Sequence, residues 1–155
     1  MAKIKWEETT VFIKEMKVIQ RNDFQNFTLD TVLLADFIRI NRKTKKVLDI
    51  GTGCGIIPML LTRKSTSKII GIELQKEMVD IAKKNIENNN LKNQVEIING
   101  DIKEYKKIFI KDEFDSIVTN PPYFDYKGDI NQINNSSKIS IARHNINLTL
   151  EEIIK

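Results

Sequence analysis

Hydrophobic and polar positions follow two different periodicities along the middle of the chain. Short apolar runs are separated by longer stretches in which apolar residues recur at helical spacing. The runs predict buried strands, and the stretches between them predict helices. The predicted strands cover residues 46–50, 68–73, 94–99 and 114–119; the predicted helices cover 28–38, the stretch after Gly55, 75–88 and 102–107.

The helix over residues 28–38 has capping candidates at its start and apolar side chains along its length. We interpret it as a covering helix whose apolar side faces the sheet. A second interpretation places Phe27 and Thr28, directly before it, over a ligand site. The side chains expected to face the sheet are Leu33, Leu34, Phe37 and Ile38.

The two ends of the chain are less regular than its middle. Residues 11–19 are ambiguous, with strand character strongest over 16–19, and residues 126–140 are polar enough to predict a loop. Thr149 and Glu152 form a capping-box pattern, so a helix is expected to begin just before the last residue. We therefore expect an N-terminal segment over 1–45 and a domain over 46–155 that is incomplete at its C-terminus. Strand 114–119 would then lack a neighbour and leave an apolar edge prone to self-association.

Strands that alternate with helices predict an α/β fold with a parallel sheet and right-handed crossovers. The carboxyl ends of parallel strands share one edge of the sheet, where ligands bind. Each unusual residue of this chain comes just after such an end. They are the segment from Asp49 to Gly55, Glu73, Asp101, and the segment from Asn120 to Tyr123.

The segment Asp49-Ile50-Gly51-Thr52-Gly53-Cys54-Gly55 predicts a glycine-rich turn between a buried strand and a helix. Glycines permit positive φ angles and a close approach of ligand to backbone, and we expect bare N–H groups there. The nicotinamide fingerprint G-x-G-x-x-G does not fit, because Ile56 stands where its third glycine belongs. A phosphate-binding P-loop is absent as well. The spacing D-x-G-x-G-x-G resembles the loop of Rossmann-like, class I S-adenosylmethionine-dependent methyltransferases.

This resemblance implies cofactor roles for acidic residues at the next two strand ends. Glu73 stands where such an enzyme needs a carboxylate that accepts hydrogen bonds from both ribose hydroxyls. Asp101 and the backbone N–H of Ile102 suit the edge of the adenine. A plain helix-capping role remains the alternative for both acids. The cofactor-binding residues implied are Asp49, Gly51, Thr52, Gly53, Cys54, Gly55, Glu73, Leu74, Asp101, Ile102 and Asn120.

The segment Asn120-Pro121-Pro122-Tyr123 indicates the reaction class. An amine on a planar ring or an amide is a poor nucleophile, because its lone pair is delocalised. The Asn120 side-chain oxygen and the Pro121 carbonyl could each accept one of its N–H groups, and Tyr123 offers a face for stacking. Catalysis would then rest on positioning and electrostatics, with no separate base. The alternative is a turn that closes the strand around a packed tyrosine.

Composition is that of an ordinary globular domain, with 41% hydrophobic and 30% charged residues among 155. One cysteine, Cys54, excludes an internal disulfide and suits a reducing cytoplasm. With one histidine besides, we expect no metal site. No apolar run is long enough to cross a membrane. The net charge of +4 and the basic runs at 42–46 and 103–107 favour a polyanionic partner, although each run alone is typical of a solvated surface.

Three segments narrow the resemblance to one family. Residues 49–58, residues 27–35 with Ile19-Gln20 upstream, and residues 120–124 look like the bacterial tRNA1(Val) adenine-N6 methyltransferase family, and Ala142-Arg143-His144 also fits. The resemblance implies a seven-stranded sheet, of which the 3-2-1-4 portion is present here, with S-adenosylmethionine as cofactor and tRNA as substrate. The catalytic residues implied are Asn120, Pro121, Pro122 and Tyr123. Arg143 and His144 are candidates for RNA contact or for a structural hydrogen bond.

Two other functions remain open at this point. The acceptor could be a protein glutamine, as in release-factor methyltransferases, although those carry a sizeable helical domain before the glycine loop and only 48 residues precede Asp49 here. The chain could also be a cofactor- or RNA-binding module without catalysis. The oligomeric state is not indicated by the sequence.

Overall fold

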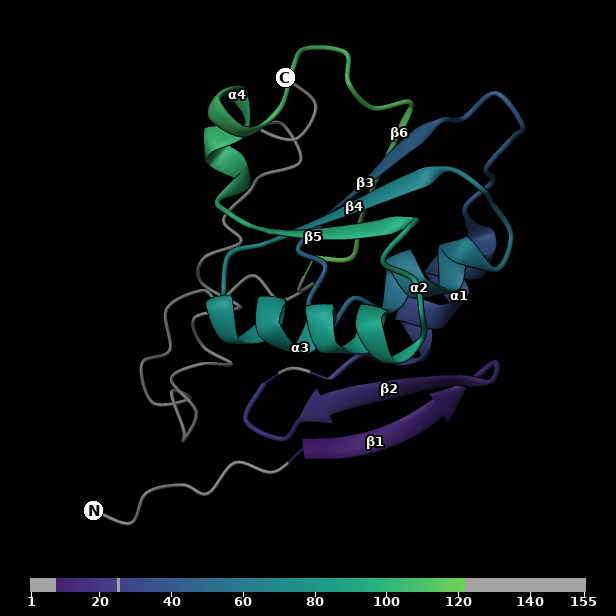
Figure 1. The fold of residues 1–155 in the computed structure, drawn as a ribbon, viewed down its shortest axis with the longest axis vertical. Coiled ribbons are helices and arrows are strands. Elements are labelled where there is room, and N and C mark those ends of the chain that lie inside the picture. The colour runs from purple at the N-terminus through teal and green to yellow at the C-terminus, as the bar shows by residue number, and fades with distance from the viewer. Residues whose placement is uncertain (1–7, 25, 122–155) are drawn as a thin grey trace.

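A computed structural model describes residues 8–24 and 26–121 of the chain. Its centre is a parallel four-stranded sheet of order β5-β4-β3-β6 (Figure 1). This order is the predicted 3-2-1-4 arrangement, so the expected α/β, Rossmann-like fold is confirmed. The strands are β3 (Lys46–Ile50), β4 (Lys68–Glu73), β5 (Val95–Asn99) and β6 (Ser116–Thr119).

Helices cover both faces of this sheet, but unequally. Three lie on one face, and the short η1 and α4 lie on the other, beyond the carboxyl end of β5 (Figure 1). Each helix predicted within the described residues is present with bounds close to those expected. The helices are α1 (Leu29–Phe37), α2 (Ile56–Thr62), α3 (Lys76–Asn88), the 3-10 turn η1 (Ile102–Glu104) and α4 (Tyr105–Ile108).

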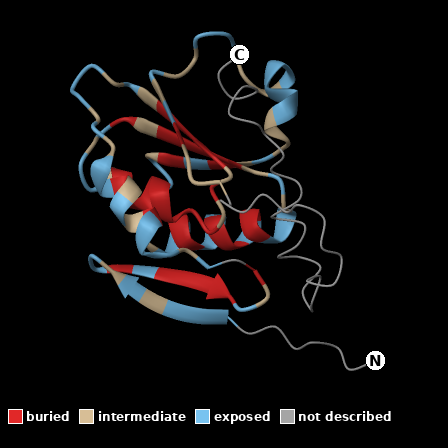
Figure 2. Ribbon diagram, turned by 180° about the vertical axis from the view of Figure 1, so that it is seen from behind, coloured by how far each residue is buried: buried red, intermediate tan, exposed pale blue. Residues whose placement is uncertain are grey.

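The main core lies between the sheet and the helices α2 and α3 (Figure 2). Six consecutive residues of α2, from Ile56 to Leu61, are buried, and Pro58 is tolerated because it falls in the first turn. On α3 the buried apolar set is the predicted one: Met78, Val79, Ile81, Ala82 and Ile86. A smaller cluster on the opposite face comprises Leu48, Ile50, Ile70 and Ile72.

The predicted inner face of α1 is wrong in part. Leu33 is 54% exposed and Phe37 is 81% exposed, whereas Leu34 and Ile38 are half-buried against the core. The buried residues are instead Thr31 and Ala35. The reason is that α1 packs against α2 rather than against the sheet. Small side chains let two helices approach closely, so they occupy the contact and the larger ones turn outward.

A hairpin precedes the sheet and is fastened to α3. It consists of β1 (Glu8–Ile13) and β2 (Met16–Arg21), so residues 11–19 hold parts of two strands. The Asn85 side chain accepts from the Ile19 N–H at 2.7 Å and donates to the Ile19 carbonyl at 3.0 Å. One turn later, Asn89 makes the same pair of bonds to the N–H and carbonyl of Lys17. These two side chains therefore pair with β2 as a neighbouring strand would.

Several sequence predictions fall outside the described residues. They concern Pro122, Tyr123, the loop over 126–140, Arg143, His144 and the helix opening at Thr149. Within the part of the chain that the structure covers, β6 pairs with β3 alone and Ile117 is 53% exposed. No helix in this part is suited to span a bilayer. The expected self-association through β6 stays a prediction.

Candidate cofactor and active site

The carboxyl ends of the four parallel strands form one rim. Ile50 on β3 stands opposite Ile72 on β4 and Thr119 on β6, and Glu73 on β4 stands opposite Asn99 on β5. The Thr119 hydroxyl also donates to the Ile50 carbonyl at 3.0 Å. All four predicted site segments therefore begin at this rim, as the topology rule requires.

The glycine-rich turn after β3 has the expected backbone shape. Gly51, Gly53 and Gly55 have φ angles of 70°, 57° and 83°, which favour glycine. At Gly55 a Cβ would also lie 3.3 Å from the Cβ of Ala82 on α3. Larger residues at these three positions would therefore distort the backbone of the turn.

The expectation of bare N–H groups in this turn is wrong for four of its residues, Gly51, Thr52, Gly53 and Gly55. The N–H groups of Gly51 and Thr52 both donate to the Ile72 carbonyl, at 2.9 and 3.1 Å. The Gly55 N–H donates to the Thr52 carbonyl at 2.9 Å, and the Gly53 N–H donates to Glu73 Oε2 at 3.0 Å. The turn uses these donors to hold its own shape, because a turn with three left-handed glycines has no helix or strand to fix it.

Asp49 is a buried carboxylate of the site that lacks hydrogen-bond partners among the described residues. It is 1% exposed, and neither carboxylate oxygen has a hydrogen-bond partner among the described residues. The Thr52 hydroxyl, also buried, is unpartnered there as well. Burial raises the pKa of Asp49 to about 7, opposed by the nearby Thr52 hydroxyl and reinforced by the charge of Glu73. An acid in such a state favours a nearby cation or hydrogen-bond donor.

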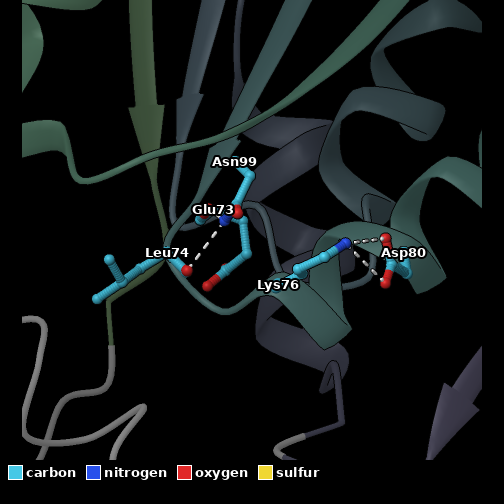
Figure 3. Close-up of polar contacts among 5 residues, drawn as sticks. All are labelled: Glu73, Leu74, Lys76, Asp80 and Asn99. Carbon is cyan, nitrogen blue, oxygen red and sulfur yellow. Dashed lines mark hydrogen bonds and ion pairs between the residues drawn. The ribbon is translucent and has the colours of Figure 1, made fainter.

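Glu73 occupies the end of β4 in a fixed orientation. Its Oε2 accepts from Gly53 and its Oε1 accepts from the Gln75 N–H at 2.9 Å, just before α3 begins. The helix-capping role considered for this residue is wrong, because Gln75 is the N-cap of α3 and the acid of its first turn is Glu77. Each carboxylate oxygen of Glu73 keeps a second lone pair for a ligand. The neighbouring Leu74 side chain is exposed and extends away from Glu73 (Figure 3).

Asn99 fixes the backbone on which Glu73 and Leu74 stand. Its Nδ2 donates to the carbonyls of both residues at 3.0 Å (Figure 3). Asn99 comes from the end of β5, so it ties two strand ends of the rim together. Beyond it, Asp101 caps η1 by accepting from the Lys103 N–H at 2.9 Å, while Ile102 is half-buried against the smaller core cluster.

Asn120 directly follows β6 and is half-buried, as is Pro121. The Asn120 Nδ2 donates to the Thr31 hydroxyl of α1 at 2.9 Å. Phe27 is half-buried and packs against the main core, and its place over a ligand stays a prediction. The helix α1 reaches the rim through Thr31, one turn further along.

Cys54 lies in the glycine-rich turn but is not a nucleophile. It is buried, and burial raises the pKa of its thiol to about 12. Its carbonyl accepts from Asn85 Nδ2 at 2.9 Å, which fastens the turn to α3 and, through Asn85, to β2. The described residues contain no cluster of three side chains able to hold a metal ion.

S-adenosylmethionine fits these residues. It has a sulfonium and an ammonium group that suit the unpartnered Asp49 carboxylate, and ribose hydroxyls that suit the remaining lone pairs of Glu73. Its adenine is flat and apolar on its faces, which suits the exposed Leu74. The parallel sheet and its rim thus define the class, a Rossmann-like methyltransferase domain.

The chain belongs to the methyltransferase small domain family, whose model matches residues 21–144. The cofactor predicted from the sequence, S-adenosylmethionine, is the one on which such methyltransferases depend. Similar curated proteins are tRNA1(Val) (adenine(37)-N6)-methyltransferases from Bacteroides thetaiotaomicron (32% identical over 129 residues, 81% of this chain and 51% of the relative) and Cytophaga hutchinsonii (28% over 142 residues, 92% and 58%). The chain spans about half the length of the curated relatives it matches. The predicted resemblance to the tRNA1(Val) adenine-N6 methyltransferase family is thereby confirmed.

Among solved structures, the chain is similar to TrmK of M. capricolum, which was determined with S-adenosylhomocysteine. The TM-score is 0.50 at 21% identity, and the match covers 60% of this chain and 40% of that one. This similarity supports the fold.

Three residues of the site escaped the sequence analysis. Thr31 had a visible signal only as part of a helix start, and Asn99 only as a polar end to a strand. Asn85 stood in a helix whose apolar set was identified correctly, and nothing local distinguished it from an exposed asparagine. Their partners lie 25 to 89 residues away along the chain, and spacing does not reveal such contacts.

Proposed function

We propose that this chain is the cofactor-binding part of an enzyme that methylates the exocyclic N6 of adenine in RNA. The proposed substrate is the tRNA1(Val) adenosine next to the anticodon, and the proposed location is the cytoplasm. The single observation that carries the proposal is Asn120 at the rim, held by its amide nitrogen, directly before Pro121. The names of the curated relatives support the same substrate.

The proposed cofactor site consists of the turn after β3 and the ends of β4 and β5. Glu73 would accept from the ribose hydroxyls, and Asp49 with Thr52 would face the charged methionine portion. Asp101 keeps its Oδ2 for the adenine amino group, because the Lys103 N–H occupies Oδ1. When bound, S-adenosylmethionine supplies a methyl group on a positively charged sulfur.

The chain's own contribution to the reaction would be made at Asn120 and Pro121. The Asn120 Oδ1 and the Pro121 carbonyl each accept one N–H of the target amine, which draws its lone pair out of conjugation. Pro121 has no N–H of its own, so it offers an acceptor without a competing donor. Tyr123 would stack on the adenine, with Pro122 holding it in place; both lie outside the described residues. No separate base is needed, since the product amine loses its proton to water.

The charge of the molecule also supports an RNA substrate. The basic run over 103–107 forms η1 and α4, directly after Asp101 at the rim (Figure 1). Its Lys107 is paired with Glu104, so Lys103 and Lys106 are the cations we assign to a backbone phosphate.

Methyl transfer to defined acceptors tests the proposal. The full-length protein is incubated with radiolabelled cofactor and either unmodified total tRNA or a release factor. We expect label in N6-methyladenosine after nuclease digestion and none in the release factor. Asn120→Ala should lower transfer at least 100-fold at saturating cofactor. Label only in protein, or full transfer by Asn120→Ala, would show that the assignment is wrong.

A further inference from the structure

The contact between Asn120 and Thr31 joins the proposed catalytic loop to a helix 89 residues earlier in the chain. Thr31 is 5% exposed and lies in the first turn of α1. Its hydroxyl oxygen also accepts from the Thr28 N–H at 3.4 Å. The Thr31 end of the bond to Asn120 is therefore shielded from water, while Asn120 itself is half-buried at the rim.

The helix that carries Thr31 is itself held at both ends. Before its start, the Phe27 N–H donates to the buried Gln20 side chain of β2 at 3.2 Å. After its end, Lys64 Nζ donates to the carbonyls of Asp36 and Ile38. These contacts anchor α1 to the hairpin and to the segment after α2. The Thr31 hydroxyl is thus a fixed point relative to the rim.

An asparagine amide has two ends of nearly equal size, but only its oxygen can accept an N–H. Rotation by 180° about its last side-chain bond would present the target amine with a second donor, which repels it. The bond to Thr31 holds the nitrogen end, so Oδ1 lies at the other end of the planar amide group. Resting on the proposed function, we infer that Thr31 is a positioning residue, which selects the amide orientation of Asn120 that accepts from the substrate amine.

The distinguishing variants are Thr31→Val and Thr31→Ser, measured by single-turnover transfer to unmodified tRNA with the full-length protein. Valine keeps the shape of threonine but cannot accept a hydrogen bond, whereas serine keeps the hydroxyl. We expect Thr31→Val to lower the rate roughly tenfold, the scale of one lost positioning bond, with unchanged cofactor affinity. Thr31→Ser should retain most of the wild-type rate.

Thr62→Val is the matched control. Thr62 also uses its hydroxyl within a helix, donating to the Met59 carbonyl at 2.7 Å, but it belongs to the end of α2. We expect this variant to transfer at the wild-type rate. An equal loss in Thr31→Val and Thr62→Val would indicate general helix weakening and would overturn the inference.

The double variant Thr31→Val/Asn120→Ala separates positioning from structure. If Thr31 acts through Asn120, the second change adds no further loss to Asn120→Ala. Additive losses, or a normal rate in Thr31→Val beside a slow Asn120→Ala, would overturn this inference alone. A normal rate in Asn120→Ala would overturn the assignment of Asn120 and this inference with it.

A readout without activity guards against a variant that folds poorly. In the nitrogen-15-labelled chain, the Asn120 side-chain amide is assigned by its loss in Asn120→Ala. We expect the proton that is bonded to Thr31 to be protected from solvent exchange in the wild type, and this protection to fall in Thr31→Val. Rapid exchange of both protons in the wild type would contradict the contact.

Discussion

Asp49→Asn should remove a pH-dependent destabilisation that is built into the glycine-rich turn. The Asp49 carboxyl is fully buried without a partner among the described residues, and burial raises its pKa from 3.8 to about 7. Between these two values the folded protein holds a proton that the unfolded chain has released. Stability from this group therefore falls as pH rises from about 4 and is fully lost above about 7.

The magnitude follows from the shift in pKa. A difference of about three units, at 1.36 kcal/mol per unit, corresponds to about 4 kcal/mol. Asparagine resembles the protonated acid in shape and does not titrate. The difference in stability between variant and wild type should thus change by about 4 kcal/mol between pH 4 and pH 8, in favour of the variant.

Urea unfolding followed by far-UV circular dichroism at several pH values measures this difference directly. Other acids, such as Asp36 and Asp115 with lowered pKa values, contribute equally to both proteins and cancel. Burying the asparagine amide has a free-energy cost that does not depend on pH, so it shifts the plot of the stability difference against pH without changing its slope. A difference that stays level from pH 4 to pH 8 would refute the reasoning.

Two further variants test how the turn is supported. In Gly71→Ala, a Cβ would lie 2.7 Å from Thr52 Oγ1 and 2.9 Å from Ile97 Cδ1. We expect the free energy of unfolding in urea to fall by about 1–3 kcal/mol and cofactor binding, measured by calorimetry, to weaken. Wild-type values for both would contradict the packing. In Asn85→Leu, three buried groups lose their partners, so we expect a loss of about 3 kcal/mol on urea unfolding. Its half-buried counterpart Asn89→Leu should lose less than half of that, and equal losses would show that the bond to the Cys54 carbonyl is unimportant.

The sheet was accessible to sequence reasoning because its signals are local. Apolar runs such as 46–50 and 68–73 are bounded by polar residues, and the helix over 75–88 shows its period plainly. The alternation of strands and helices gave the parallel sheet, and the family resemblance implied the strand order. The rim followed in turn, because strand ends in a parallel sheet meet at one edge.

The failures have a different origin. Leu33 and Phe37 are apolar but exposed, because α1 packs against α2 through its small residues Thr31 and Ala35. The N–H groups of Gly51 and Thr52 donate to the Ile72 carbonyl and that of Gly53 donates to Glu73, and these partners lie 20 or 21 residues further along the chain. The contact from Thr31 to Asn120 spans still more of the chain. Each depends on how elements pack together, which no periodicity encodes.

The claim that the rim binds S-adenosylmethionine is tested most directly by titration calorimetry on the wild type and Glu73→Ala. Glu96→Ala serves as the control, since Glu96 is an exposed acid on β5 of the same sheet. Removing two hydrogen bonds to a charged acceptor should weaken binding by about 10- to 100-fold in Glu73→Ala, with no change in Glu96→Ala. Wild-type affinity in Glu73→Ala, or no binding by the wild type, would contradict the account.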